Sequence, residues 1–477
     1  MISPQDSLKP EKTPPGPVPA NEPVTFYHWL VVIIASAGWL FDCMDQRLFA
    51  LAREPAMREI LASGTTDSMV GTWLRNFVVW ITGITLSGSP DAAVKELVGY
   101  ATGIMLIGWA TGGIIFGTMS DKLGRVKTMT VTLLVYSGFT GLSGFAHTVT
   151  EFMTYRFLVG LGVGGMFGAA TTLVAESVPT RIRAVALGSL QALSAIGNIM
   201  GSLISTQVQP GRADFLFGMS GWRILFFIGI LPALLVVPTM FVLHEPEMWK
   251  AAKRRAKAGS EKAGRIRDLF FGHPVRRRNV LVGIGLGLAG MAGLWGVGFF
   301  SPELISTALK GSPQHVVDTV RGYGLALQDV GSFLGMVAFT VVATRWGRKP
   351  AFLIAFILCF GVTIFVFNSL KTGADAYWML PLMGFAQLSV FGGYAIYFPE
   401  LFPTRLRGTG VGFCYNTVRY LAAGFPPLLM LINRQLIEGG VADPFRKAAT
   451  FLSFIFLLGL VALIWAPETK GQPLPED

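Results

Sequence analysis

The sequence predicts an all-α integral membrane protein with twelve transmembrane helices in two pseudo-symmetric six-helix bundles. Of its 477 residues, 52% are hydrophobic and only 14% are charged, and many apolar runs reach the ~20 residues that a bilayer core requires. Two charged segments also occur twice: the turn at 121–125 recurs at 344–348, and Glu-x-x-Pro-Thr-Arg-x-Arg at 176–183 recurs at 400–407, each almost half the chain later. Duplicated halves predict two lobes that rock around a central site.

The chain begins with a proline-rich segment, residues 1–26, which predicts a disordered cytoplasmic tail. A long outer loop, 53–96, is expected between the first two spans. Its portion Met69–Gly88 is apolar, but Arg75 interrupts it and a span there would break the charge pattern, so we expect a loop that touches the membrane. The twelve expected spans are 28–52, 97–119, 128–147, 151–178, 184–207, 222–243, 279–305, 321–343, 350–369, 376–401, 408–432 and 446–466.

The net charge of +11 comes from basic residues that cluster in the turns after even-numbered spans and in the middle connection. This pattern indicates orientation in a membrane rather than nucleic-acid binding, and it predicts that both termini face the cytoplasm. We expect an N-terminal bundle over 27–243 and a C-terminal bundle over 279–467. A basic cytoplasmic linker, 244–278, joins them on the anionic inner leaflet, and 468–477 forms a cytoplasmic tail.

Patterns of catalysis and metal binding are missing from the sequence. Cys43, Cys359 and Cys414 all lie in apolar runs, so they predict neither disulfides nor a metal site. The glycine-rich stretch 160–168 lies inside an apolar span, where small residues allow close helix packing instead of phosphate binding. We therefore expect no enzyme activity and no cofactor.

Charged residues inside the expected spans are costly in a membrane, so they are usually paired or functional. Asp42 and Asp45 lie roughly 20 to 26 Å from the start of the first span, at ~1.5 Å per residue, and Arg156 begins the fourth span at a compatible depth. A carboxylate that pairs with Arg156 when ionised and releases it when protonated would couple transport to protons. One of the two Asp residues is free to orient Arg47 or a neighbour. The alternative is a permanent structural pair.

Arg419 lies near the midplane of the eleventh span and needs an anion. Asp329 is the candidate within the chain, and a carboxylate-bearing substrate is the other, because arginine offers a forked pair of donors that matches a carboxylate. Polar residues near the same depth are candidates for substrate hydrogen bonds, although buried amides also bond neighbouring helices. They are Gln191, Asn198, Gln328, Gln387, Tyr394, Tyr397 and Asn416.

The repeated charged turns predict a conformational switch. Asp121 is placed to accept hydrogen bonds from a helix N-terminus, and Arg125 to bridge to Glu176 at the inner end of the fourth span. In the second half, Glu400 would pair with Arg345 or Arg348. The remaining members are Gly117, Arg183 and Arg407. The alternative is that these residues only set topology through positive charge.

Several motifs resemble a known family. Gly-x-x-x-Asp-Lys-x-Gly-Arg-x-Lys at 117–127 is similar to the signature loop between spans two and three of major facilitator superfamily transporters. Arg-x-x-x-Gly-x-Gly-x-Gly at 156–164 resembles that superfamily's signature in span four. Pro-Glu-Thr-Lys-Gly at 467–471 resembles the ending of its sugar porter branch. The resemblance covers residues 28–471 and implies the major facilitator fold.

A narrower likeness involves two spans. Asp-Cys-Met-Asp at 42–45 and Tyr-Asn-Thr-Val-Arg at 415–419 resemble the proton symporters for sialate and aromatic acids. Those relatives usually have glycine where this chain has Cys43 and Val418. The likeness implies proton-coupled uptake of a small organic anion by a monomer in the plasma membrane, the inner membrane of a bacterium, with the proton gradient as driving force. Sugar or other neutral-metabolite symport is one alternative. Multidrug or metabolite efflux is another, although the Gly-Pro signature of span five is absent.

Overall fold

The computed structural model describes residues 23–63, 90–257, 264–271 and 273–475, whose regular structure is almost entirely helical. In the first half the elements are α1 (Phe26–Ala62), α3 (Pro90–Leu123), α4 (Arg125–Ser143), α5 (Val149–Ser177), α6 (Thr180–Val208), α7 (Gly221–Ile228), the 3-10 helix η1 (Leu231–Leu235) and α8 (Val236–Val242). Two helices of the middle connection follow, α9 (Glu247–Lys257) and α10 (Arg267–Phe270). In the second half they are α11 (Pro274–Gly296), η2 (Gly298–Phe300), α12 (Ser301–Ala308), α13 (Gln314–Arg345), α14 (Arg348–Ser369), α15 (Gly373–Glu400), α16 (Arg407–Asn416), α17 (Val418–Ala422), α18 (Phe425–Glu438), α19 (Pro444–Leu452) and α20 (Ile455–Trp465).

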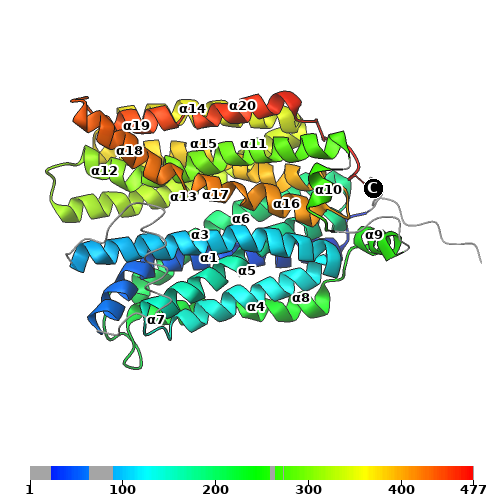
Figure 1. Cartoon of the computed structure of the whole chain (residues 1–477), viewed down its shortest axis with the longest axis horizontal. Helices are drawn as coiled ribbons and strands as arrows, with labels where there is room; N and C mark the ends of the chain where they lie inside the picture. The colour runs from blue at the N-terminus through cyan, green and yellow to red at the C-terminus, as the bar shows by residue number, and fades with distance from the viewer. Residues whose placement is uncertain (1–22, 64–89, 258–263, 272, 476–477) are drawn as a thin grey trace, which may run out of the picture.

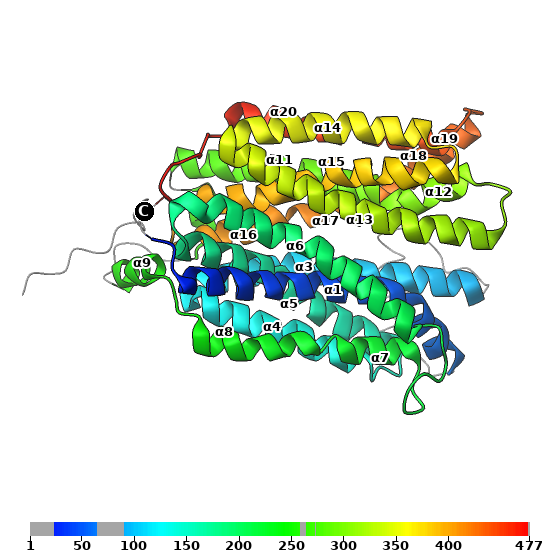
Figure 2. The ribbon, with the colours of Figure 1, turned by 180° about the vertical axis from the view of Figure 1, so that it is seen from behind.

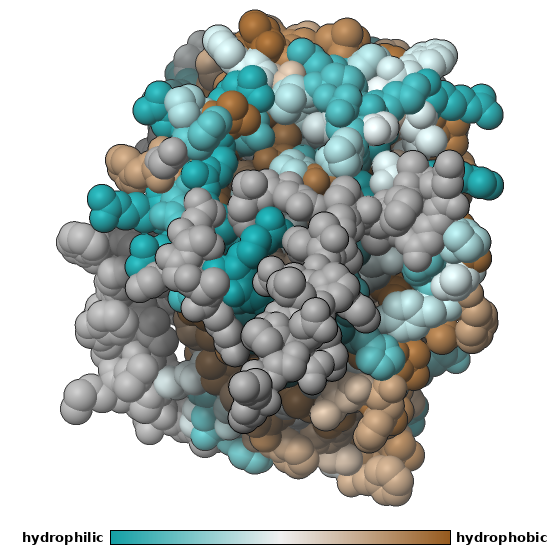
Figure 3. Space-filling model, turned by 90° about the vertical axis from the view of Figure 1, so that its right-hand side faces the viewer, coloured by the Kyte–Doolittle hydropathy of each residue, from teal (hydrophilic) through white to brown (hydrophobic). Residues whose placement is uncertain are grey.

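The helices form two lobes that lie side by side, one built from α1 to α8 and the other from α11 to α20 (Figures 1 and 2). The lobes meet where α3 packs against α16 and where α6 packs against α13. Helix α9 and the C-terminal residues lie at one end of the molecule, which we call the linker end (Figure 1). Viewed face-on, this end carries many hydrophilic side chains, and hydrophobic side chains appear toward its rim (Figure 3). That distribution fits a bundle whose sides face lipid and whose end faces water.

Ten helical stretches of the described residues are long and apolar enough to cross a membrane. The two other expected spans are helical but differ in character. Residues 128–147 correspond to α4, a 19-residue helix with many Thr, Ser and Gly residues. Residues 408–432 are divided among α16, α17 and α18, because the regular helix is interrupted at Thr417 and again at Ala423–Gly424. The paired-bundle architecture is as predicted from the sequence.

The predicted outer loop 53–96 is wrong at both of its ends. Helix α1 continues ten residues past the expected end of the first span, and α3 begins at Pro90. Glu59 anchors this extension because its carboxylate accepts hydrogen bonds from the Trp222 indole at 2.7 Å, the Arg223 guanidinium at 3.2 Å and the Ser220 hydroxyl. The apolar stretch Met69–Gly88 and residues 1–22 of the N-terminal tail lie outside the described residues.

The sequence duplication is visible in the helix starts of the two halves. Gly124 and Gly347 precede α4 and α14 with φ of 127° and 114°, a conformation that glycine tolerates and L side chains rarely adopt. The Glu245 carboxylate accepts hydrogen bonds from the first backbone N–H groups of α4, the nearest at 2.7 Å. Glu468 does the same for α14, at 2.9 and 3.0 Å. Carboxylates at these positions satisfy otherwise unpaired N–H groups and favour the positive end of the helix dipole.

Two further features repeat at a spacing of 223 or 224 residues. Thr148 and Glu151 form a capping box at α5, and Thr372 and Asp375 form one at α15. In addition, one arginine in each half donates to two backbone carbonyl groups: Arg223 at the C-terminal end of α4, and Arg446 at the C-terminal end of α14. Because Glu245 and Glu468 complete the bundles, the boundaries predicted at 243 and 467 cut through each bundle's last structural contact.

Candidate functional site

The linker end is held closed by buried charges from both lobes. Arg125, at the start of α4, donates to the Glu176 carboxylate through Nε and Nη2, both at 2.9 Å, and to the Thr404 carbonyl of the other lobe at 2.6 Å. Arg407 of the second lobe donates to the same Glu176 carboxylate. All three charged side chains are almost completely buried. A carboxylate held by one arginine from each lobe therefore ties the lobes together.

Asp121 makes a second connection across the lobes. It sits near the end of α3 and accepts hydrogen bonds from the backbone N–H groups of Gly408 and Thr409 at 2.9 and 2.8 Å. The Thr409 hydroxyl donates to it at 2.7 Å, and Arg125 lies 3.1 Å away. Gly117, one turn earlier, allows this contact, because a side chain there would collide with the carbonyl oxygen of Gly408. The start of α16 is thus the helix N-terminus that the sequence argument required.

The second half repeats the arginine–glutamate contact but not the aspartate. Arg348 donates to Glu400 at 2.8 and 3.1 Å. Arg345, the other sequence candidate for Glu400, makes no contact with it among the described residues and instead lines a cavity between α13 and α6. Arg183 donates to Thr180 at 3.2 Å and interacts electrostatically with Glu400, which brings it into the same cluster.

Toward the opposite end, an ion pair between described residues joins the lobes. Arg47 of α1 lies 2.7 Å from Asp329 of α13, and both side chains are partly exposed, 26% and 18%. This contact corrects the expectation that Asp329 is the partner of Arg419 within the chain. It also leaves Asp329 engaged by a cation rather than available to a substrate in this conformation.

The buried carboxylates of α1 lie between these two closures. Asp42 accepts one hydrogen bond, from Gln46 at 3.3 Å, and its Oδ1 has no partner among the described residues. Asp45 is fully buried near the Thr140 hydroxyl, but neither of its oxygens has a hydrogen bond of normal geometry in the described structure. Asp42 interacts electrostatically with Asp45 and with Arg419 of the other lobe. The two carboxyl groups are therefore placed where a proton would relieve an unpaired buried charge.

Arg156 faces Asp45 without contacting it. Its guanidinium donates to the Ser143 hydroxyl at 2.5 and 3.1 Å and lies over the rings of Phe226 and Phe49, at 4.7 and 5.4 Å from their centroids. It interacts electrostatically with Asp45, but no direct ion pair joins them in the described structure. The expected ion pair between Arg156 and an α1 carboxylate is thus not formed in the described structure, where the guanidinium is held by aromatic faces and the Ser143 hydroxyl instead.

Arg419 lies at the centre of an aromatic cluster between the lobes. Its guanidinium carbon is 4.0 Å from the centroid of Trp109 in the first lobe and 4.5 Å from that of Tyr415 in the second. One terminal nitrogen donates to the Tyr415 carbonyl and to Asn416 Oδ1, whereas Nε has no partner among the described residues. Tyr415 stacks on Phe167 with centroids 3.7 Å apart. Two flat surfaces and a partly used guanidinium therefore converge here.

The expected polar residues divide into two groups. Asn416 and Tyr394 are used by the fold: Asn416 donates to Gly412 at 2.9 Å and to Gly164 of the other lobe at 3.3 Å, and the Tyr394 hydroxyl donates to a carbonyl of α11 at 2.6 Å. Buried amide oxygens without a described partner remain in the side chains of Gln191, Gln328 and Gln387. Asn198 is half-buried, and its side chain makes no described hydrogen bond.

Sequence reasoning missed several contributors. Glu245 and Glu468 lie 223 residues apart, and so do Arg223 and Arg446, so extending the repeat search to single residues would have found both pairs. The stacked pair of Phe167 and Tyr415 had no such signal, because one ring comes from each lobe.

Comparisons with known proteins agree with this architecture. Residues 61–427 match the family model described as Major Facilitator Superfamily. A putative metabolite transport protein of Haemophilus influenzae is 31% identical over 417 residues, which cover 85% of this chain and 96% of that protein. The cis,cis-muconate transport protein of Acinetobacter baylyi is 29% identical, covering 77% and 84%.

Among solved structures, the proton:xylose symporter XylE bound to 6-bromo-6-deoxy-D-glucose superposes with a TM-score of 0.70 at 18% identity, covering 94% of this chain and 98% of that one. At that identity the superposition shows the shared fold. Together with the match to the family model, it shows that this multi-pass membrane protein is a transporter that belongs to the Major Facilitator Superfamily.

Proposed function

We propose that the protein takes up a small organic anion together with protons, by alternating access, and that Arg419 binds the carboxylate of the substrate. The observation that carries this proposal is the unfinished coordination of Arg419, a buried cation at the lobe interface whose Nε has no described partner. A guanidinium in a membrane needs an anion, and its planar fork matches the two oxygens of a carboxylate.

The aromatic surroundings favour a flat substrate. Trp109 and Tyr415 cover the guanidinium, and Phe167 and Trp39 extend the aromatic surface, with the Trp39 ring 5.1 Å from Phe167. Aromatic faces stack on planar π-systems. The similarity to a protein named for cis,cis-muconate, a conjugated dicarboxylate, supports an unsaturated or aromatic acid as the substrate class.

Proton coupling is supported by the electrostatic contact between Asp42 and Arg419. An ionised Asp42 partly neutralises Arg419 and repels an arriving carboxylate, so the anion binds better once Asp42 is protonated. Because such coupling is reciprocal, a bound anion also favours the protonated form of Asp42. Asp45, whose oxygens are unpaired in the described structure, offers a second proton site beside Arg156. Anion and proton would therefore be carried together.

The two closures supply the alternating access. The buried network around Glu176 closes the linker end, and the partly exposed ion pair of Arg47 and Asp329 lies toward the other end. The first closure is larger and more buried, so this conformation is closed at the linker end. We propose that both termini lie on the cytoplasmic side of an inner membrane, in line with the positive charge of the linker.

A neutral sugar or polyol is the second candidate. The unpartnered amide oxygens of Gln191, Gln328 and Gln387 suit hydroxyl donors and do not require a charged ligand. The two candidates differ in what they demand of Arg419, because a neutral hydroxyl compound gains little from the guanidinium fork.

The test uses purified protein in proteoliposomes with an imposed pH gradient, acidic outside, and radiolabelled cis,cis-muconate or xylose. Wild type should accumulate muconate and not xylose, and Asp42→Asn should still exchange muconate across the membrane while losing accumulation. Asp214→Asn, which removes an exposed carboxylate, is the matched control and should accumulate normally. Accumulation of xylose alone would select the sugar candidate. Undiminished accumulation in both Asp42→Asn and Asp45→Asn would place the proton site elsewhere.

A further inference from the structure

The two seams between the lobes are closed differently at the linker end. Along α3 and α16 the backbones touch, because a Cβ on Gly412 would lie 2.3 Å from the carbonyl oxygen of Gly113, and Asp121 then bonds across. The sequence repeat places Thr344 of α13 where α3 has Asp121. The Thr344 hydroxyl donates to the Thr340 carbonyl of its own helix at 2.7 Å, so it makes no bond to α6 among the described contacts.

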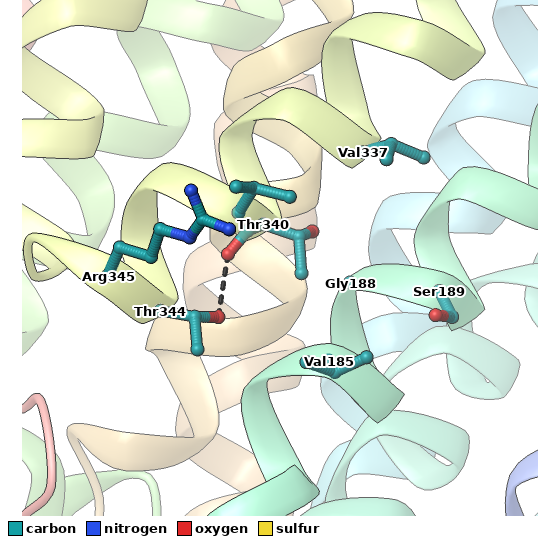
Figure 4. A pocket seen from close by; sticks show the side chains of 8 residues that line it. Val185, Gly188, Ser189, Val337, Thr340, Thr344 and Arg345 are labelled. Carbon is teal, nitrogen blue, oxygen red and sulfur yellow. Dashed lines mark hydrogen bonds between the residues drawn. The ribbon is translucent and has the colours of Figure 1, made fainter.

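A cavity of about 240 Å³ occupies this second seam. Its walls come from the two helices: Val185, Gly188 and Ser189 from α6, and Val337, Thr340, Val341, Thr344 and Arg345 from α13. Figure 4 labels all of these except Val341. The helices approach each other closely at Gly188, where a Cβ would lie 2.0 Å from the Thr340 hydroxyl oxygen. The valines border the outside of the bundle, with exposed fractions of 47% for Val185, 40% for Val337 and 43% for Val341. The cavity is therefore an apolar groove open to the lipid.

Unpartnered positive charge stands at the linker-end mouth of the groove. Arg345 lines the groove, and its exposed guanidinium has no acceptor among the described residues, although its backbone carbonyl accepts a hydrogen bond from Lys470. Arg181 lies one turn before Val185, on the same face of α6, and is likewise exposed without a described partner. On α13, Val341 and Val337 precede Arg345 by one and two turns. Each wall thus runs from an arginine to valines in the direction of the membrane interior.

We propose that this groove binds one anionic glycerophospholipid, with the phosphate held by Arg345 and Arg181 and part of an acyl chain lying along the valines. Arginine forks bind phosphate oxygens in pairs, and basic pockets between membrane helices take anionic headgroups. A free phosphate would use only the mouth. A zwitterionic lipid such as phosphatidylcholine also carries a phosphate, but its own cationic group neutralises that phosphate, so the positive charge of the two arginines would stay uncompensated. The combination of a charged mouth and an apolar wall selects a lipid that carries a net negative charge.

Binding there acts on the conformation of the transporter. The headgroup bridges one arginine from each lobe, and those arginines otherwise repel each other when the linker end is closed. The bound lipid therefore favours the conformation closed at the linker end. It links the two lobes at the seam of α6 and α13, as Asp121 does at the seam of α3 and α16.

The test is native mass spectrometry of the full-length protein with phosphatidylglycerol or phosphatidylcholine of identical acyl chains. Wild type should retain one phosphatidylglycerol in preference to phosphatidylcholine, and the double variant Arg181→Gln/Arg345→Gln should lose at least fivefold in occupancy. Lys122→Gln is the matched control, because Lys122 precedes Arg345 by one repeat length and is exposed on the seam where the helix backbones touch. It should bind as wild type does.

A second variant keeps both charges and removes the space. Val341→Phe should fill the groove and lower phosphatidylglycerol occupancy. This variant tests the lipid site even where loss of both arginines disturbs folding. Glycerol 3-phosphate, the headgroup without chains, should not bind. Equal phosphatidylglycerol occupancy in wild type and the groove variants, or glycerol 3-phosphate binding as firm as that of the lipid, would overturn the proposal.

Discussion

Replacing Asp121 by asparagine should open the linker end of the transporter. The Asp121 carboxylate accepts three hydrogen bonds from α16, at 2.7 to 2.9 Å, and all of them cross between the lobes. They exist only while the linker end is closed, so their loss raises the free energy of that conformation alone. The asparagine side chain is nearly the same size as aspartate, which keeps the packing of α3 intact.

The size of the expected shift in the conformational equilibrium follows from these hydrogen bonds. An amide keeps one acceptor oxygen, so it can retain the bonds from Thr409 or the bond from Gly408, while its NH₂ group faces a backbone donor. At least one bond to a charged acceptor is lost, worth about 1.5 to 3 kcal/mol. At 1.4 kcal/mol per tenfold change, the equilibrium should shift roughly 10- to 150-fold toward the conformation open at the linker end.

Double electron–electron resonance can measure this shift. Spin labels on Lys127→Cys and Trp346→Cys report on the two lobes, because both side chains are exposed near the linker end. The background would lack the three buried native cysteines. Asp121→Asn should move much of the distance distribution to longer values, and Asp214→Asn should leave it unchanged. An identical distribution in Asp121→Asn would refute the reasoning and leave the motif as a topology signal.

Four further predictions address other parts of the molecule. Arg47→Gln should shift the same spin-label distribution the opposite way, by about fivefold or less because the lost pair is partly exposed; a shift in the same direction as Asp121→Asn would contradict the two-ended model. Arg419→Lys should raise the Kd for a carboxylate substrate about tenfold, because one charge-assisted hydrogen bond of about 1.5 kcal/mol is lost, and should change the Kd for a sugar little. Equal losses of affinity for both ligands, measured by calorimetry, would mean that Arg419 is structural. Glu468 is partly buried, but hydrogen bonds from four backbone N–H groups outweigh that burial and lower its pKa. Its contribution to stability is therefore present above the unfolded pKa of about 4.3 and disappears as pH falls through the folded pKa. Glu468→Gln should flatten the pH dependence of thermal unfolding in that acidic range, and an unchanged profile would exclude the effect. Cysteines at Asp214 and Arg254 should react with membrane-impermeant reagent from opposite faces, outside and inside respectively, and labelling from one face would refute the proposed topology.

The architecture was predictable because duplication and hydropathy are properties of the chain itself. The contact of Arg125 with Glu176 was predictable for the same reason, since both residues lie at helix ends at the same level. Counting residues gives depth along a helix at ~1.5 Å per residue. It does not give the direction in which a side chain points, and that is where the predictions about contacts were wrong or incomplete.

Asp329 shows this limit. Its depth allowed a pairing with Arg419, but the face of α13 on which it lies turns it to Arg47. The choice between Arg345 and Arg348 was open for the same reason, and the positive φ of Gly347 decides it by redirecting the chain between them. Contacts between lobes, such as that of Arg407 with Glu176, depend on how two separately folded bundles meet.

The capping role of Glu245 sets where the polypeptide can be divided. A first half that ends with the last helix of its bundle, at Val242, would lack the carboxylate that caps α4 and also Trp249, whose indole donates to the Asp121 carbonyl at 2.9 Å. Two co-expressed fragments should therefore reassemble when the break falls beyond Trp249, and poorly when it falls directly after α8. A similar contact lies near the C-terminus, where Arg407 donates to the carbonyl of Pro475 at 2.9 Å. A purification tag that replaces the chain before Pro475 would therefore remove a contact of the closed linker end.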